Sequence, residues 1–306
     1  MTLHIETPLI QSRPLSLAAG RSIWLKLEAL QPPGSFKIRG IGAACEIHAR
    51  QGKRRFVSSS GGNAGIAVAY AGRNLSIPVT VVVPQSTTER ARQLIRQENA
   101  ELVVHGETWH EANELALSML GPDDAFLHPF DDPRLWEGHA TLVDEVARSG
   151  PKPDAVVLSV GGGGLFSGVV EGLRRNGWGD VPVITVETRG AEGLARSLEE
   201  GRRVELERIE SIATSLGARQ VCQHAFDLAR QHPVRSCVVS DLAALDACER
   251  FLDDHRILVE PACGASLAIP YQVRDMLPEG NILVVVCGGV TASFDQLRKW
   301  RAALAE

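Results

Sequence analysis

Residues 155–168 read AVVLSVGGGGLFSG, in which an apolar β-branched run leads through four glycines into a helical pattern. This order predicts a buried strand, a tight turn and a helix. Four consecutive glycines carry a large entropic cost for a simple turn, but they let backbone N–H groups at a helix N-terminus approach an anion closely. The spacing does not match G-x-G-x-x-G, and G-x-x-x-x-G-K-[ST] does not occur. A single compact phosphate is therefore favoured over a dinucleotide or a nucleoside triphosphate.

The same alternation recurs along the chain and predicts an α/β protein whose parallel strands are covered on both faces. Further strands are expected at residues 21–28, 56–59, 79–83, 102–105, 183–187, 237–239 and 282–287. Helical spacing follows most of these runs, including residues 36–50, where Ser35 is placed to cap the helix. Breaks at PFDDP (residues 129–133) and PKP (residues 151–153) indicate two units, one of them built around residues 43–128.

Composition and charge are typical of a soluble globular protein. The chain has 306 residues, of which 44% are hydrophobic and 23% charged, with a formal net charge of -5. That balance argues against nucleic-acid binding, and no apolar run is long enough for a membrane span. We expect no signal peptide, because the first residues show no basic start followed by an apolar core. Six cysteines without a CxxC pair favour free thiols, so we also expect a cytoplasmic protein. Few residues follow Arg301, so we expect no C-terminal regulatory domain.

The stretch PGSFKIRG, residues 33–40, delivers Lys37 into the first turn of a predicted helix. The partial positive charge of a helix N-terminus disfavours a cation at that position. A lysine placed there loses its proton more easily, which is what an imine-forming amine needs. The alternative for any single lysine is a solvated surface residue.

The stretch SSSGGNAG, residues 58–65, sets small residues between a strand and a helix. Exposed backbone N–H groups there suit a carboxylate or a phosphate, and Asn63 adds a side chain that can both donate and accept. A tight turn that needs glycine for backbone reasons alone is the alternative.

Two residues at strand ends are further candidates. Cys287 follows an apolar strand and precedes two glycines, where its thiol can present a weak donor to a ring nitrogen. A small buried apolar residue is the alternative for an isolated cysteine. Glu187 also ends a strand, where it can be a cation ligand or a carboxylate at the start of a helix.

In this order and combination the motifs resemble the fold-type II pyridoxal-phosphate (PLP) enzymes. Within that group the chain looks like the L-serine dehydratase/threonine deaminase family, and is most similar to its short catabolic serine dehydratases. The motifs that carry the resemblance are GSFKIRG, SSSGGNAG, PFDDPRLWEGHA, SVGGGGL, ETRGA, ILVEPACGASLA and VVVCGG. The resemblance implies two open, mostly parallel sheets flanked by helices. It places the cofactor in the cleft between a large PLP-binding domain (residues 1–42 and 129–306) and a small domain (residues 43–128).

The resemblance also implies the catalytic and substrate-binding residues. Lys37 holds PLP as an imine and then removes the α-proton of the substrate. Ser60, with the loop formed by Gly61, Gly62 and Asn63, receives the substrate carboxylate. Racemases of this fold place a serine base where Gly61 stands, so we expect little racemisation. The missing side chain at Gly61 also predicts a larger pocket beside the substrate.

Cofactor and cation contacts complete the implied site. Phe36 and Phe130 flank the cofactor ring, Asn63 meets its 3′ oxygen and Cys287 faces its pyridine nitrogen. The phosphate is held by the backbone of Gly161, Gly162, Gly163, Gly164 and Leu165. A monovalent cation such as K+ is implied at Glu187 and at the carbonyl groups of Ala191, Leu216 and Ala218.

The implied reaction is that of a lyase, an L-serine/L-threonine ammonia-lyase. L-Serine would yield pyruvate and ammonia, and L-threonine would yield 2-oxobutyrate and ammonia; a homodimer is usual for this family. A β-replacement enzyme of the cysteine synthase type and a non-catalytic PLP binder remain alternatives on the same fold. The glycine spacing disfavours a third alternative, a nicotinamide-dependent dehydrogenase.

Overall fold

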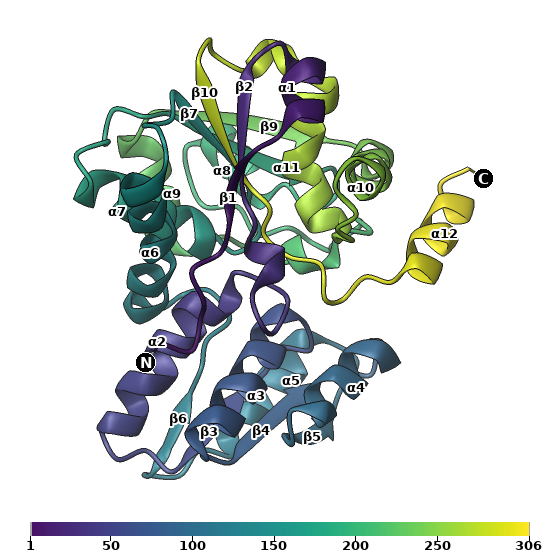
Figure 1. Ribbon diagram of the computed structural model, residues 1–306. Coiled ribbons are helices and arrows are strands. Elements are labelled where there is room, and N and C mark those ends of the chain that lie inside the picture. Colours follow the sequence, from purple (N-terminus) through teal and green to yellow (C-terminus); the bar gives the residue numbers. More distant parts are fainter. Residues whose placement is uncertain (1, 306) are drawn as a thin grey trace.

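Ten strands form two separate sheets in the computed structural model of the protein, which describes residues 2–305 (Figure 1). The larger sheet has the order β1-β2-β10-β7-β8-β9, and the smaller has the order β5-β4-β3-β6. The pair β1–β2 is antiparallel and the other pairs are parallel. The strands are β1 (Leu9–Gln11), β2 (Ser22–Lys26), β3 (Arg55–Ser58), β4 (Val79–Val83), β5 (Glu101–Val104), β6 (Asp124–Phe126), β7 (Ala155–Ser159), β8 (Val183–Thr188), β9 (Val234–Val239) and β10 (Asn281–Val285).

Helices connect the parallel strands and bury their faces, as parallel sheets require. The smaller sheet is accompanied by α2 (Lys37–Arg50), α3 (Asn63–Leu75), α4 (Glu89–Gln97) and α5 (Trp109–Ser118). Around the larger sheet lie α1 (Arg13–Ala19), α6 (Pro133–Ser149), α7 (Gly164–Arg175), α8 (Gly193–Glu200), α9 (Gln223–Gln231), α10 (Asp241–His255), α11 (Pro261–Gln272) and α12 (Phe294–Ala303). Three 3-10 turns complete the elements, namely η1 (Glu28–Leu30), η2 (Thr214–Leu216) and η3 (Arg274–Met276).

Strand β10 forms the centre of the larger sheet and of the core. Its Val284 pairs with Leu25 of β2 on one side and with Val157 of β7 on the other. All three side chains are completely buried. A central parallel strand has no side that faces solvent. The position of β10 in the sheet therefore explains why its residues are all apolar in the run that predicted it.

The structure confirms the predicted α/β class and most of the predicted strands, with ends that shift by a few residues. Two short strands were not predicted. Strand β1 is a three-residue antiparallel edge strand with its Ile10 exposed, so it lacks the apolar pattern of a buried strand. Strand β6 is also three residues long and begins with Asp124, a residue type that is uncommon in strands.

The predicted helix cap at Ser35 is wrong. Helix α2 begins at Lys37 after Phe36, and no side chain caps it. The Ser35 backbone instead pairs with Gly288 in an isolated bridge, and the Ser35 hydroxyl is buried without a partner among residues 2–305. The loop before the helix is therefore set by a long-range contact and not by local capping.

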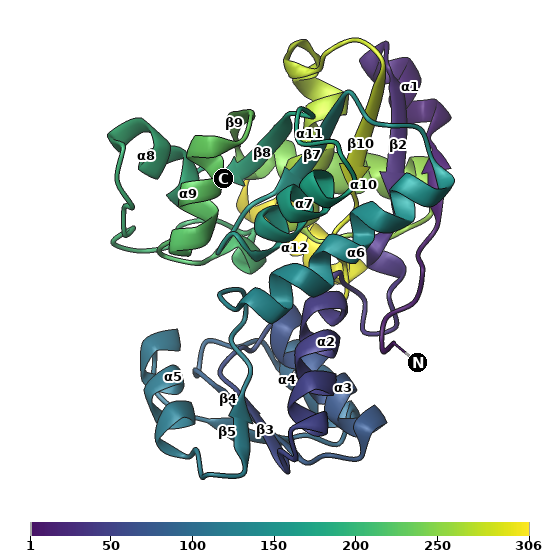
Figure 2. The same ribbon diagram turned by 90° about the vertical axis from the view of Figure 1, so that its left-hand side faces the viewer.

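Helix α2 joins the two halves of the molecule. It contacts α3 beside the smaller sheet and α6 beside the larger sheet, and Figure 2 shows it directly below α6. The predicted domain boundary after residue 42 falls inside this helix. We propose the same division for the folded protein, since the strands within residues 43–128 form one sheet and the strands outside them form the other. Among the described helices, none combines the length and the apolar character that crossing a bilayer requires.

Candidate active site

Three neighbouring parallel strands bring the predicted residues to one edge of the larger sheet. Cys287 follows the end of β10, the glycine run begins just after β7, and Glu187 stands at the end of β8. Because β10, β7 and β8 are adjacent and parallel, their carboxyl ends meet at the same edge. That edge is where open α/β sheets bind ligands.

The Lys37 segment is tied to this edge by backbone hydrogen bonds. The Phe36 N–H donates to the carbonyl oxygen of Cys287 at 2.9 Å, and the Gly289 N–H donates to that of Gly34 at 3.1 Å. Gly34 has a φ of +79°, and a Cβ there would lie 2.5 Å from Val290 Cβ. Only glycine fits this crossing, which sets Lys37 beside Cys287.

Lys37 is half-buried at the start of α2, and its Nζ donates to the carbonyl oxygen of Pro129. Burial lowers the pKa of Lys37 to about 8, although Cys287 and Glu260 act to raise it. The ammonium form is poorly stabilised because its partner is a carbonyl group and not a carboxylate. The structure therefore agrees with the prediction of an easily deprotonated amine.

The glycine run forms a cradle at the N-terminus of α7. Gly163 has a φ of +95°, which favours glycine, and a Cβ on Gly161 would lie 2.9 Å from Leu216 Cα. Within residues 2–305, none of the backbone N–H groups of residues 161–165 donates a hydrogen bond. Unpaired N–H groups at the start of a twelve-residue helix fit a compact anion such as the phosphate of PLP.

Phe130 covers this cradle. A Cβ on Gly162 would lie 2.3 Å from Phe130 Cγ, so the ring packs directly on the glycine backbone. Phe130 follows Pro129, whose carbonyl group holds Lys37, so the amine and the cradle are linked through two adjacent residues. Phe36 lies nearby and packs on His139 with ring centroids 4.9 Å apart. That Phe36 and Phe130 flank a cofactor ring remains a prediction.

The predicted substrate loop precedes α3, which begins at Asn63. The Gly62 N–H donates to the hydroxyl of Ser60 at 3.4 Å, so the loop is partly held by its own serine. A Cβ on Gly61 would lie 2.5 Å from Thr87 Oγ1. Thr87 thus fills the space that the absent side chain was expected to leave open, and the prediction of a larger pocket at Gly61 is wrong.

Asn63 is buried, and its Nδ2 donates to Glu260 Oε1 at 2.7 Å. Its Oδ1 is buried without a partner among residues 2–305. A buried polar atom without a partner is rare in a folded protein and fits a place where a ligand completes the hydrogen bonding.

Cys287 is buried. The neighbouring Cys263 thiol and burial both raise the pKa of Cys287 well above its usual value. A thiol held neutral in this way can offer only a weak S–H donor to a ring nitrogen.

Glu187 is completely buried and accepts two backbone N–H groups, from Leu194 at 2.8 Å and from Ala195 at 2.7 Å. Burial raises the pKa of Glu187 to about 8, while these two hydrogen bonds act to lower it. The contacts agree with the alternative that Glu187 is a carboxylate at the start of a helix, here α8.

The other predicted cation ligands lie close to this helix start. Ala191 lies two residues before Gly193, the first residue of α8, and the carbonyl oxygen of Ala218 lies 3.8 Å from an ideal Cβ on that glycine. The carbonyl oxygen of Leu216 accepts the Ala218 N–H at 2.8 Å. Cation binding at Glu187, Ala191, Leu216 and Ala218 remains a prediction.

Three residues near the site carried no individual prediction. Glu260 contacts Asn63, Thr87 adjoins Gly61, and the fully buried His139 packs on Phe36. Glu260 and His139 stand in the motifs ILVEPACGASLA and PFDDPRLWEGHA, which gave the only sequence signal. Thr87 stands in no motif.

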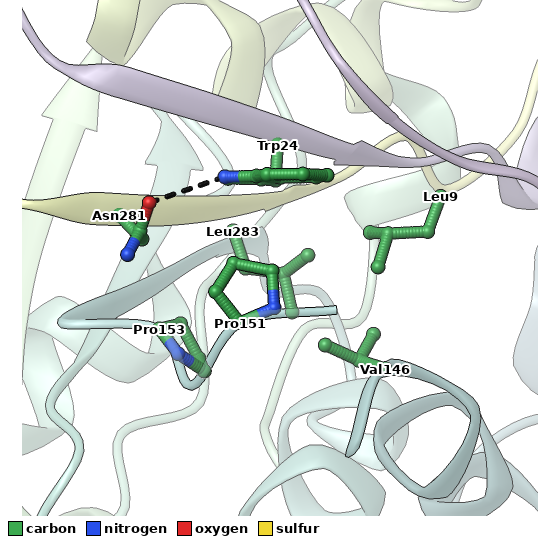
Figure 3. Close-up of a pocket in the computed structure, with 7 residues that line it drawn as sticks. All are labelled: Leu9, Trp24, Val146, Pro151, Pro153, Asn281 and Leu283. Carbon is green, nitrogen blue, oxygen red and sulfur yellow. Dashed lines mark hydrogen bonds between the residues drawn. The ribbon is translucent and has the colours of Figure 1, made fainter. Parts of the chain in front are cut away.

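A separate crevice lies between β1, β2, β10 and the segment that links α6 to β7 (Figure 3). It is lined by Leu9, Trp24, Val146, Pro151, Pro153, Asn281 and Leu283. The indole of Trp24 donates to Asn281 Oδ1 at 3.2 Å, and no titratable carboxylate, amine or imidazole lines the crevice. It therefore offers no groups for acid–base chemistry.

Comparisons with known proteins show the family of this chain. Residues 1–288 match the family described as "Pyridoxal-phosphate dependent enzyme". The chain is 46% identical over 315 residues to the L-serine dehydratase/L-threonine deaminase of Mus musculus, covering 99% of this chain and 96% of that protein. The Homo sapiens protein of the same description is 47% identical over 314 residues, with the same shares of 99% and 96%.

Solved structures give the same result. A fungal L-serine ammonia-lyase from Rhizomucor miehei superposes with a TM-score of 0.94 at 36% identity, covering 99% of both chains. Threonine deaminase isoform 2 from Solanum lycopersicum superposes with a TM-score of 0.88 at 28% identity, covering 97% of this chain and 87% of that one. The folded chain has the two mostly parallel sheets of these enzymes, and it belongs to the family of pyridoxal-phosphate dependent enzymes.

Proposed function

We propose that the protein is an L-serine/L-threonine ammonia-lyase that removes the β-hydroxyl and the amino group of L-serine, giving pyruvate and ammonia. L-Threonine would give 2-oxobutyrate by the same route. The observation that carries the proposal is the position of Lys37, whose desolvated amine is joined through Pro129 and Phe130 to the glycine cradle. The family match and the names of the similar proteins support the same chemistry.

Bound PLP supplies a conjugated, electron-withdrawing ring that makes the α-proton of an attached amino acid removable. Lys37 then serves as attachment point and as base. At pH 7 an amine with a pKa of about 8 is neutral in about one molecule in ten, against about three in ten thousand for an ordinary lysine. The buried position of Lys37 therefore increases the neutral amine that can take a proton.

Cys287 favours elimination over reactions that store negative charge. A neutral thiol cannot protonate the pyridine nitrogen as a carboxylic acid would, so the ring withdraws electrons less strongly. Loss of the β-hydroxyl relieves the negative charge at once, which suits a weak electron acceptor. Phe130 and Phe36 would hold the ring between them and keep water from Lys37.

The substrate carboxylate fits the loop before α3. Backbone N–H groups at a helix N-terminus attract anions, and Ser60 adds a hydroxyl. Gly61 supplies no side chain and Thr87 fills the space beside it. With no evident second base at position 61, we propose that racemisation is slow.

Three finer properties belong to the same proposal. The first is a monovalent cation such as K+ at Glu187 and the carbonyl groups of Ala191, Leu216 and Ala218, supported by the position of Glu187, Ala191 and Ala218 at the start of α8. The second is a homodimer, supported by the resemblance to the family. The third is a cytoplasmic location, supported by six cysteines that form no disulfide.

The test is production of pyruvate from L-serine by the purified, PLP-loaded protein without sulfide or another second substrate. We expect turnover in the unaltered protein, none above background in Lys37→Ala, and full turnover in the exposed control Lys299→Ala. A β-replacement enzyme would form almost no pyruvate without a second nucleophile. A non-catalytic binder would hold PLP and form none at all, and either result would overturn the proposal.

A further inference from the structure

Glu260 lies at the centre of the site and has no role in the function described so far. It directly precedes α11 and is only 3% exposed. Its backbone N–H donates to the carbonyl oxygen of Gly288 at 3.3 Å, which ties it to the loop that follows Cys287. A buried carboxylate in this position needs an explanation, because burying a charge is costly unless it is paired and hydrogen-bonded.

Both oxygens of the Glu260 carboxylate are held by donors. Oε1 accepts from Asn63 Nδ2 at 2.7 Å, and Oε2 accepts from the hydroxyl of Thr291. Burial raises the pKa of Glu260, while these two donors, with Ser215 and Lys37 nearby, act to lower it. Donors on both oxygens satisfy the ionised carboxylate, which has only acceptors to offer.

Glu260 also bears on the charge of Lys37. The Glu260 N–H donates to Gly288 and the Phe36 N–H donates to the adjacent Cys287, so the carboxylate and the amine are held by the same loop. Cys287, Glu260 and Cys222 act to raise the pKa of Lys37, and Glu260 is the carboxylate among them. The other titratable groups facing Lys37 are thiols and imidazoles, namely Cys287, Cys222, His128 and His139. Those facing Glu260 are Lys37, Cys248 and Cys287. Burial keeps these thiols and imidazoles uncharged, so Glu260 supplies the negative charge near the amine.

We propose that Glu260 is a positioning residue with two separable effects on the reaction proposed above. Its acceptor oxygen fixes the amide of Asn63, and its negative charge stabilises the ammonium form of Lys37. The second effect matters after proton transfer, because a base that takes the α-proton becomes a cation in a site where burial disfavours cations. Glu260 contacts Asn63 and Thr291, and it acts on the reaction through Asn63 and Lys37.

Glu260→Gln isolates the effect of charge. Glutamine keeps the size of the side chain and an oxygen that can accept from Asn63, but it removes the negative charge. In the protein freed of PLP, competitive labelling with acetic anhydride and peptide mapping gives the pH midpoint of the Lys37 amine. We expect this midpoint to fall by about half to one pH unit. Glu114→Gln, on the exposed face of α5, is the control and leaves the midpoint unchanged.

Glu260→Asp isolates the effect of position, because the charge stays while the shorter side chain withdraws from Asn63. The Lys37 midpoint should stay within about 0.3 pH units. PLP affinity should fall about tenfold, the loss expected when one hydrogen bond to a charged group is broken. In an Asn63→Ala background the same change should have little further effect, because the two residues act through one contact.

An unchanged Lys37 midpoint in Glu260→Gln would overturn the electrostatic part of the inference. Additive losses for Glu260→Asp and Asn63→Ala would overturn the positional part. If Glu260→Gln fails to fold, as thermal melting would show, Glu260→Asp still decides the positional part, and Glu260→Leu, which removes the charge with an apolar side chain of similar size, replaces Glu260→Gln in the labelling. Labelling needs no turnover, so an absence of pyruvate from L-serine would defeat the proposed function without deciding the role of Glu260.

Discussion

Lys37 and Arg39 are cations two residues apart in the first turn of α2, and their surroundings are opposite. The Arg39 guanidinium donates two hydrogen bonds to Glu28, at 2.7 and 2.8 Å, and two to Glu145, both at 2.7 Å. Lys37 donates to a carbonyl group and to no carboxylate. Burial acts against both charges, but the carboxylates raise the pKa of Arg39, whereas the pKa of Lys37 falls to about 8.

The difference in surroundings indicates different roles: the charge of Arg39 stabilises the fold, whereas the amine of Lys37 takes part in the chemistry. Lys26 also bonds to Glu145, so the buried cluster of Arg39, Glu28, Glu145 and Lys26 contains two cations and two carboxylates. Such a cluster joins α2 to η1 and α6 and holds the start of the helix rigidly. Lys37 extends from that fixed point without a paired charge, so its amine can change protonation at modest cost.

Replacement of Lys37 should have the largest effect on activity and almost none on stability. In Lys37→Met the amine is lost, and turnover of L-serine should fall at least about 10³-fold. The melting temperature should stay the same or rise, because a poorly paired buried amine is replaced by an apolar group of similar length. Coupled pyruvate assays and thermal melting check both statements. A melting temperature lowered as far as in Arg39→Met would break the comparison.

Replacement of Arg39 should act on stability. Arg39→Met leaves Glu28 and Glu145 buried with one fewer cation, and we expect a loss of about 3–5 kcal/mol in the free energy of unfolding. Arg50→Met at the exposed end of the same helix is the control and should change it by less than about 0.5 kcal/mol. Urea unfolding of both variants measures the difference. Equal, small losses would show that the buried cluster does not hold α2.

A methyl group added to the cradle tests the other side of the Lys37 site. In Gly162→Ala the new Cβ would meet the Phe130 ring at 2.3 Å, so the ring or the loop must shift. Overpacking of this kind costs about 1–3 kcal/mol, so we expect PLP to be retained about 5- to 150-fold more weakly. Gly179→Ala, where the closest contact would be an ordinary 3.7 Å, should retain PLP normally. Equilibrium dialysis of PLP distinguishes the two variants.

The last prediction concerns pH. Only the neutral Lys37 amine can attack the aldehyde of PLP, so covalent uptake by the PLP-free protein should accelerate as pH rises. Below about pH 8 the rate should increase about tenfold per pH unit, and above it the rate should level off. Stopped-flow absorption across pH 6 to about 10 follows the reaction. If the rate continued to rise until the pH neared the pKa of an ordinary lysine, about 10, burial would not lower the pKa of Lys37.

The sequence predicted the parts of the site that have local signatures. The glycine run after β7 and the small residues before α3 each stand between an apolar run and a helical pattern, so their positions at strand ends could be inferred. Cys287 could be placed in the same way. These predictions depend on backbone geometry, which short stretches of sequence specify well.

The contacts made across the fold were beyond sequence reasoning. Serine often caps helices, but the backbone of Ser35 pairs with Gly288, more than 250 positions away, and its side chain does not cap α2. The missing side chain of Gly61 predicted open space beside the substrate, but Thr87 from another loop fills that space. Glu260 stands in a recognised motif, but its role depends on Asn63 and Thr291, which come from two other parts of the chain.

The assignment of Lys37 is tested most directly by finding the lysine that carries PLP. The PLP-loaded protein is treated with borohydride, which fixes the cofactor to its amine, and the modified peptide is then identified by mass spectrometry. We predict that the label lies on Lys37 alone, in the peptide that contains the sequence GSFKIRG. A label on Lys26, Lys53 or any other lysine, with Lys37 unmodified, would contradict the account.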